Sequence, residues 1–206
     1  MKLHSVKWPP RAPGLSRTLV LLHGYGADEN DLLSISHELD PRLGAISLQG
    51  PLPLGQGGRA WFNLSQTREG FSFDLEEVKR ASELVLEAVE EIARESPKPI
   101  LLGFSQGASM ALGLALAHPE LCAGVFSLSG VPPRTEGLAA PELLRGLKIF
   151  AAHGVNDPLI PIAAARANRD ALVALGLAVT WREYPMGHNV SLPELEDARA
   201  WLKDVA

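Results

Sequence analysis

Cysteine and excess positive charge are both scarce in this 206-residue sequence, and each shortage narrows what the protein can be. Cys122 is the only cysteine, so the chain cannot form an internal disulfide, which favours a reducing cytoplasm as its location. Its 19 Lys and Arg residues are outnumbered by 24 Asp and Glu residues, and the net charge of −5 offers no electrostatic basis for binding nucleic acid. We therefore expect a cytoplasmic protein without a nucleic-acid partner.

Long apolar runs and cofactor motifs are missing as well. The N-terminal MKLHSVKWPP lacks the apolar stretch of a signal peptide, and the longest apolar run is far shorter than the roughly 20 residues that span a membrane, so no integral membrane contact is expected. No HExxH, CxxC or Walker A pattern occurs, and we expect neither a metal nor another cofactor. The letters GQGGRA at residues 55–60 fit a dinucleotide-binding pattern, but Trp61 and Phe62 follow them where a helix is required.

What the sequence does contain is a regular alternation of short strand patterns with helical patterns. We expect strands at residues 3–8, 18–22, 45–49, 99–104, 124–128, 148–152 and 179–184, and helices at residues 29–39, 75–95, 106–118, 163–175 and 192–205. Asp74 and Glu77 form a variant of the capping box at the start of the longest helix. The alternation predicts an α/β fold with a mostly parallel central sheet of about seven strands and helices on both faces. Because no linker or repeat interrupts it, we expect residues 1–206 to form a single domain.

A serine stands where the most apolar strand turns into an Ala- and Leu-rich helix, in the sequence Gly103-Phe104-Ser105-Gln106-Gly107. Such an abrupt turn strains the backbone of the serine, and glycines two residues away on each side relieve the crowding around it. The helix that begins at Gln106 points free N–H groups and its positive dipole end at the reacting centre. Ser105 is therefore the predicted nucleophile.

A serine hydroxyl needs a base, and the base needs an acid to orient it. Of the six histidines, His188 alone follows the serine in a loop late in the chain, whereas His23 and His153 each precede a glycine at a strand end and are expected to pack or to orient loops. Asp157 lies between Ser105 and His188 in sequence, in the loop HGVNDPLIP after a strand. We predict His188 as the base and Asp157 as the acid.

An ester under attack develops a negative oxygen, which requires two fixed hydrogen-bond donors. The backbone N–H of Gln106, directly after the nucleophile, is one candidate. The other is the backbone N–H of Tyr25, because glycines on both sides of it let the loop after an early strand bend close. These two groups form the predicted oxyanion hole.

The segments HGYGADEND, GFSQGASMA, HGVNDPLIP and GHNV together resemble the carboxylesterase/phospholipase family of α/β-hydrolases, which includes the acyl-protein thioesterases. The resemblance covers the chain from about Thr18 to the final helix. It implies an α/β-hydrolase fold and assigns the same nucleophile, acid, base and oxyanion donors as the residues themselves. It also implies that the chain forms a homodimer. The family often has Trp-Phe-Asp where this sequence has Trp61-Phe62-Asn63, so no role is carried over to that acid.

These residues predict a serine hydrolase that cleaves small-molecule acyl esters through an acyl-enzyme. Lysophospholipase and acyl-thioester hydrolase activity stay open, because all three reactions share the same attack. An idle hydrolase-fold binding protein is the remote alternative, since it would not need all three triad residues. Residues 129–147 are too few for a large cap domain. We therefore expect an open site for short to medium acyl chains, with an apolar wall made by Trp61 and Leu159.

Overall fold

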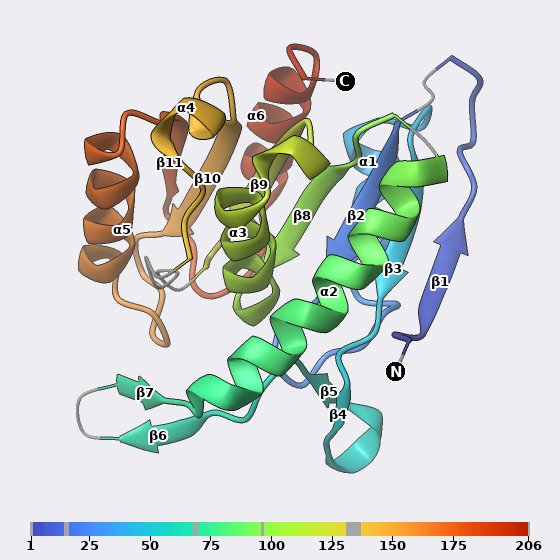
Figure 1. Cartoon of the computed structure of the whole chain (residues 1–206). Coiled ribbons are helices and arrows are strands. Elements are labelled where there is room, and N and C mark those ends of the chain that lie inside the picture. The colour runs from blue at the N-terminus through green and yellow to red at the C-terminus, as the bar shows by residue number, and fades with distance from the viewer. Residues whose placement is uncertain (1, 15–16, 68–69, 96, 131–136, 206) are drawn as a thin grey trace.

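The fold is built around a seven-stranded sheet (Figure 1), as seen in a computed structural model that describes residues 2–14, 17–67, 70–95, 97–130 and 137–205. The strand order is β1-β3-β2-β8-β9-β10-β11. The strands are β1 (Ser5–Trp8), β2 (Thr18–Leu22), β3 (Gly44–Leu48), β8 (Ile100–Phe104), β9 (Gly124–Leu128), β10 (Lys148–Gly154) and β11 (Ala178–Tyr184). Every neighbouring pair is parallel except β1 with β3. The predicted mostly parallel α/β sheet is confirmed.

Helices cover both faces of the sheet. They are α1 (Leu33–Leu39), α2 (Leu75–Glu95), α3 (Gln106–Ala117), α4 (Pro141–Leu144), α5 (Ile162–Ala174) and α6 (Leu192–Leu202). Apolar residues of α2, α3 and α5 pack into one core cluster, and those of α1 and α6 pack into a second cluster. Strand β2 joins the first cluster through Val20 and Leu22 and the second through Leu19 and Leu21, because successive side chains of a strand point to opposite faces. Burial on both faces explains why this strand is uniformly apolar.

Short elements that the sequence patterns did not predict lie between β3 and α2. Strands β4 (Leu52–Pro53) and β5 (Arg59–Ala60) pair around the 3-10 turn η1 (Gly55–Gly57), and β6 (Ser65–Thr67) pairs with β7 (Gly70–Ser72). A second 3-10 turn, η2 (Pro119–Leu121), follows α3. Figure 1 shows the β6–β7 hairpin projecting beyond the helical layer.

The start of α1 and the N-terminal cap of α2 both differ from the expectation. Helix α1 begins at Leu33 and not at residue 29, because the side chain of Asp28 accepts the backbone N–H of Asn30 and makes a turn. At α2, Asp74 accepts the N–H of Glu76, but the Glu77 carboxylate accepts the N–H and the Nδ2–H of Asn63. The predicted reciprocal bond of a capping box is therefore replaced by a contact to the preceding loop.

The described part of residues 129–147 contains no large cap. Residues 131–136 lie outside the described residues, and the helix found in the described remainder is the four-residue α4. In the described ranges, no helix is both long enough and apolar enough to cross a membrane.

Candidate active site

The candidate site lies where the parallel strands end, and its centre is the turn between β8 and α3. Ser105 has φ +53° and ψ −116°, a strained conformation for a residue with a side chain. The two flanking glycines are required by close backbone packing. A Cβ on Gly103 would lie 2.2 Å from the Gly107 oxygen, and a Cβ on Gly107 would lie 2.0 Å from the Leu22 oxygen. This packing explains the spacing Gly-x-Ser-x-Gly and leaves the serine hydroxyl at the tip of the turn.

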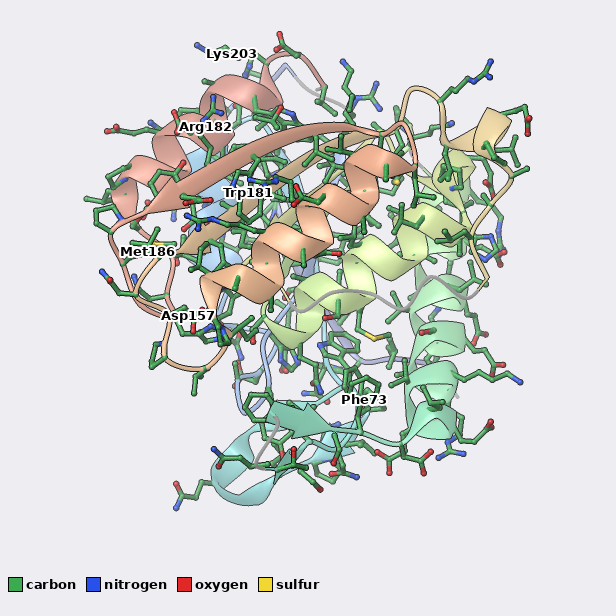
Figure 2. The ribbon with its side chains drawn as sticks, turned by 90° about the vertical axis from the view of Figure 1, so that its left-hand side faces the viewer. Phe73, Asp157, Trp181, Arg182, Met186 and Lys203 are labelled. Carbon is green, nitrogen blue, oxygen red and sulfur yellow. The ribbon has the colours of Figure 1, made fainter. Side chains whose placement is uncertain are left out.

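The structure brings together the three side chains that the sequence singled out. His188 Nε2 lies 2.9 Å from the Ser105 Oγ, and His188 Nδ1 lies 2.7 Å from the Asp157 Oδ2. Asp157 follows β10 and His188 follows β11, and Figure 2 shows Asp157 near Met186 and far from Lys203, which lies at the opposite end of the sheet. A base held between a hydroxyl and a carboxylate can take the proton from the hydroxyl.

The Asp157 carboxylate is buried and fully surrounded by donors. Its Oδ1 accepts the N–H of Leu159 at 2.8 Å and of Ile160 at 2.9 Å. Burial alone would raise the pKa of Asp157, but the hydrogen bonds from Ile160, His188 and Leu159 outweigh it and lower the pKa. The group is therefore ionised at neutral pH, as required to hold the Nδ1–H of His188 and to stabilise its imidazolium.

A second histidine, His153, contacts the same carboxylate. Its Nε2 lies 2.9 Å from the Ile160 carbonyl oxygen and 3.3 Å from the Asp157 Oδ2. A carbonyl oxygen can only accept, so His153 Nε2 carries the proton and donates it. Sequence reasoning placed His153 in packing or loop orientation but not against the acid. Its position four residues before Asp157 was the available signal.

The two predicted oxyanion donors come from separate segments that both approach Ser105. A Cβ added to Gly24 would lie 3.4 Å from the Ser105 Cβ, so the loop after β2 packs against the nucleophile. Within the described part of the chain, the backbone N–H groups of Tyr25 and Gln106 donate to no protein acceptor. Gln106 is the first residue of α3, where an N–H has no partner inside the helix. Both N–H groups are therefore available to a ligand oxygen, and their role in an oxyanion hole stays a prediction.

The residues expected to form an apolar wall lie in different environments. Leu159 is 52% exposed in the loop after Asp157, and its contact with substrate stays a prediction. Trp61 is only 1% exposed, and its indole Nε1 donates to the His23 carbonyl oxygen at 2.8 Å. The expectation that Trp61 faces the acyl group is therefore wrong, because its side chain is buried in the core cluster and hydrogen-bonded to the residue that follows β2.

Asn63 has a structural explanation where the family often has Asp. Its N–H and Nδ2–H both donate to the Glu77 carboxylate, at 2.8 and 3.0 Å. An aspartate at this position would bring a second carboxylate against Glu77, and like charges repel. Asparagine therefore suits the contact that joins this loop to α2.

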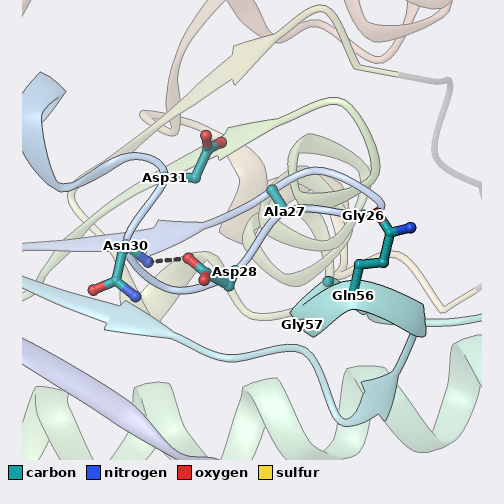
Figure 3. Close-up of a pocket in the computed structure, with 8 residues that line it drawn as sticks. Gly26, Ala27, Asp28, Asn30, Asp31, Gln56 and Gly57 are labelled. Atoms are coloured by element: carbon teal, nitrogen blue, oxygen red, sulfur yellow. Dashed lines mark hydrogen bonds between the residues drawn. The ribbon is translucent and has the colours of Figure 1, made fainter.

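A hollow of about 420 Å³ lies beside the loop that follows β2 (Figure 3). It is lined by Gly26, Ala27, Asp28, Asn30, Asp31, Gln56, Gly57 and Gly58. The pKa of the Asp31 carboxyl is raised, mainly because the group is partly buried.

Across the described ranges, no group of three or more His, Cys, Asp or Glu side chains is placed to hold a metal ion.

Comparisons with known proteins show which family this chain is similar to. The family model described as phospholipase/carboxylesterase matches residues 10–206. The acyl-protein thioesterase 1 of Eremothecium gossypii is 32% identical over 94% of this chain and 89% of its own length, and the esterase YpfH of Escherichia coli is 30% identical over 86% and 77%. The crystal structure of the Bacillus cereus carboxylesterase matches with a TM-score of 0.84 at 25% identity, covering 99% of this chain and 95% of that one. The family match spans every candidate site residue.

Proposed function

The chain belongs to the phospholipase/carboxylesterase family of α/β-hydrolases, and from this membership we propose that it is a serine hydrolase acting through an acyl-enzyme. A carboxylic ester hydrolase is what its relatives and structural neighbours indicate. The observation that carries the mechanism is the pair of contacts made by His188, 2.9 Å to the Ser105 Oγ and 2.7 Å to the Asp157 Oδ2.

In the proposed reaction, His188 Nε2 takes the proton of Ser105 as the serine oxygen attacks the carbonyl carbon. The N–H groups of Tyr25 and Gln106 donate to the resulting oxyanion. The C–O bond to the leaving alcohol then breaks, and His188 passes the proton to that alcohol. In the second half, His188 takes a proton from water as the water oxygen attacks the acyl carbon. The bond from that carbon to the Ser105 Oγ then breaks, His188 returns the proton to the Oγ, and the acid is released. Asp157 stabilises the imidazolium in both halves.

The proposed substrates are small-molecule esters with short to medium acyl chains. This preference is supported by the small size of the segment between β9 and β10, where a cap could have enclosed a longer chain. Acyl-thioester hydrolysis is the second candidate, because an acyl-protein thioesterase is 32% identical over most of this chain. Lysophospholipids share the same attack and form a third class to test.

Location, partners and assembly are proposals of the same kind. Cys122 is free and buried, and burial raises the pKa of its thiol to about 12, so it stays protonated and unreactive. A thiol in this state is consistent with a cytoplasmic enzyme. A homodimer and the absence of a nucleic-acid partner are proposed from the family resemblance and from the net charge.

The test is covalent labelling with a fluorophosphonate followed by a substrate panel. Intact-mass analysis should show one adduct per chain, located on Ser105, and Ser105→Ala should lose both the adduct and the esterase activity while its circular dichroism spectrum is unchanged. Matched oxygen esters, thioesters and lysophospholipids of increasing chain length would then rank the substrate classes by kcat/KM. An unlabelled protein without activity on any of them would support the idle binding protein instead.

A further inference from the structure

The two predicted oxyanion donors belong to segments that are far apart in sequence, and residues 59–62 touch both of them. We propose that Trp61 is a positioning residue that holds these two N–H donors in a fixed position relative to each other. This inference rests on the proposed function. Its side chain is bonded to the loop that carries the Tyr25 N–H, and its backbone is bonded to the side chain of Gln106.

On the helix side, both ends of the Gln106 amide are in use. Gln106 Oε1 accepts the backbone N–H of Trp61 at 2.9 Å, and Gln106 Nε2 donates to the Phe62 carbonyl oxygen at 2.7 Å. Gln106 is 2% exposed, so these bonds form away from water, where an unpaired amide would be unfavourable. The first residue of α3, which supplies one donor, is thereby attached to residues 61–62.

On the loop side, the contacts determine the orientation of one peptide group. Trp61 Nε1 donates to the His23 carbonyl oxygen at 2.8 Å, and the His23 ring lies 5.3 Å from the indole. His23 Nδ1 donates to the Gly24 carbonyl oxygen at 2.8 Å, while its Nε2 accepts the Gly50 N–H at 3.0 Å. The Gly24 carbonyl and the Tyr25 N–H are part of one planar peptide unit and point in opposite directions. Holding the carbonyl therefore aims the N–H.

The backbone of the same segment reinforces this arrangement. The Gly26 N–H donates to the Arg59 oxygen at 2.9 Å, and the Arg59 N–H donates to the Ala27 oxygen at 2.8 Å. Residues 59–62 thus form a continuous hydrogen-bonded link between residues 23–27, which follow β2, and the start of α3. Among the contacts described above, the Trp61 indole is the one side chain of this link that donates a hydrogen bond to residues 23–27. Trp61 was expected to contact the acyl chain, and its burial gives it this other role.

The consequence for catalysis follows from the sensitivity of an oxyanion hole to geometry. Loss of one donor lowers kcat by about 100- to 1,000-fold, and a donor that is only displaced loses part of that. The bonds to the substrate oxygen strengthen in the transition state, so a displaced donor should lower kcat with little effect on KM.

The experiment compares Trp61→Phe with Trp181→Phe. The first removes the Nε1–H that binds His23, and the second removes an Nε1–H that binds the Glu183 Oε1 at 2.9 Å on β11 (Figure 2). Active sites are counted by complete reaction with a fluorophosphonate, and kcat is expressed per counted site. We expect Trp61→Phe to lower kcat about 10- to 100-fold with KM within about twofold. Its Ki for a trifluoromethyl ketone should rise by the factor by which kcat/KM falls, and Trp181→Phe should match the wild type.

A second variant tests the contact between residues 61–62 and Gln106. It also keeps the proposal testable if Trp61→Phe folds poorly. Gln106→Met removes both amide bonds at similar volume and should lower kcat per site in the same way. In a double-mutant cycle the two losses should be less than additive, because both act through one link.

Unchanged kcat per site with a lower melting temperature would show that Trp61 only stabilises the fold and would overturn the proposal. A raised KM with unchanged kcat would also overturn it, in favour of a wall of the acyl site. Failure of the wild type to label or to hydrolyse esters would instead defeat the proposed function, so the two failures are distinguishable.

Discussion

Replacing Asp157 by Asn is the sharpest perturbation of the site, because it keeps the shape of the side chain and changes only its hydrogen bonding. All four neighbours of the carboxylate are N–H donors. The backbone groups of Leu159 and Ile160 donate to Oδ1, and the rings of His188 and His153 approach Oδ2. An amide offers one accepting oxygen and one donating NH₂ group. In either orientation, its NH₂ group therefore faces two donors.

The two orientations have different consequences: the first lowers activity and the second lowers stability. With the amide oxygen toward Leu159 and Ile160, the NH₂ group donates to His188 Nδ1, and the histidine proton moves to Nε2. Nε2 then points a proton at the Ser105 oxygen 2.9 Å away and cannot accept one. This tautomer lowers kcat by up to about 10⁴-fold, or about 5.4 kcal/mol at 1.36 kcal/mol per tenfold. In the other orientation the NH₂ group meets two backbone donors, and the loop loses stability instead.

The assay is kcat on a p-nitrophenyl ester, with thermal unfolding to confirm that the variant is folded. Asp170→Asn is the matched control, because Asp170 is an exposed residue of α5 paired with Arg169. We expect it to retain wild-type kcat. A loss of less than about tenfold for Asp157→Asn, or a severe loss for Asp170→Asn, would refute the assignment of the acid.

Two further predictions concern stability. Gly107→Ala should destabilise the fold by about 3 kcal/mol or more and abolish activity, because its Cβ would lie 2.0 Å from a backbone oxygen that cannot move aside. Gly113→Ala in the same helix, where a Cβ meets nothing within 4 Å, should be neutral or stabilising by up to about 1 kcal/mol. Urea unfolding checks both, and equal midpoints for the two variants would contradict the packing argument. Glu194 is fully buried, and burial raises its pKa to about 7. An unfolded glutamate ionises near pH 4.5, so the wild type should lose stability relative to Glu194→Gln as pH rises from 4.5 to 7, by about 3 kcal/mol at most, with the full difference present above pH 7. Urea unfolding of both proteins at pH 4.5 and pH 8 measures this difference, and a constant gap between them would exclude it.

The sequence by itself determined the parts of this protein that depend on local pattern. Strands β2 and β9 and helix α2 have the predicted bounds, because apolar runs and an amphipathic period are written in consecutive residues. The order Ser105, Asp157, His188 was also readable, since each residue follows a strand and parallel strands end at one edge of the sheet. The structure places these three side chains in contact.

Tertiary structure alone decided which contacts the remaining polar and aromatic groups make. Trp61 was expected to form an apolar wall of an open site, yet it directly follows β5, its side chain is buried, and its backbone N–H donates to the Oε1 of Gln106, 45 residues away. Glu77 has the spacing of a capping box but binds Asn63. His153 contacts Asp157 because the loop that follows β10 turns back toward the end of that strand. These partners depend on how separate segments pack, because a hydrogen bond forms with the donor or acceptor that packing brings within range. A local sequence pattern does not contain that information.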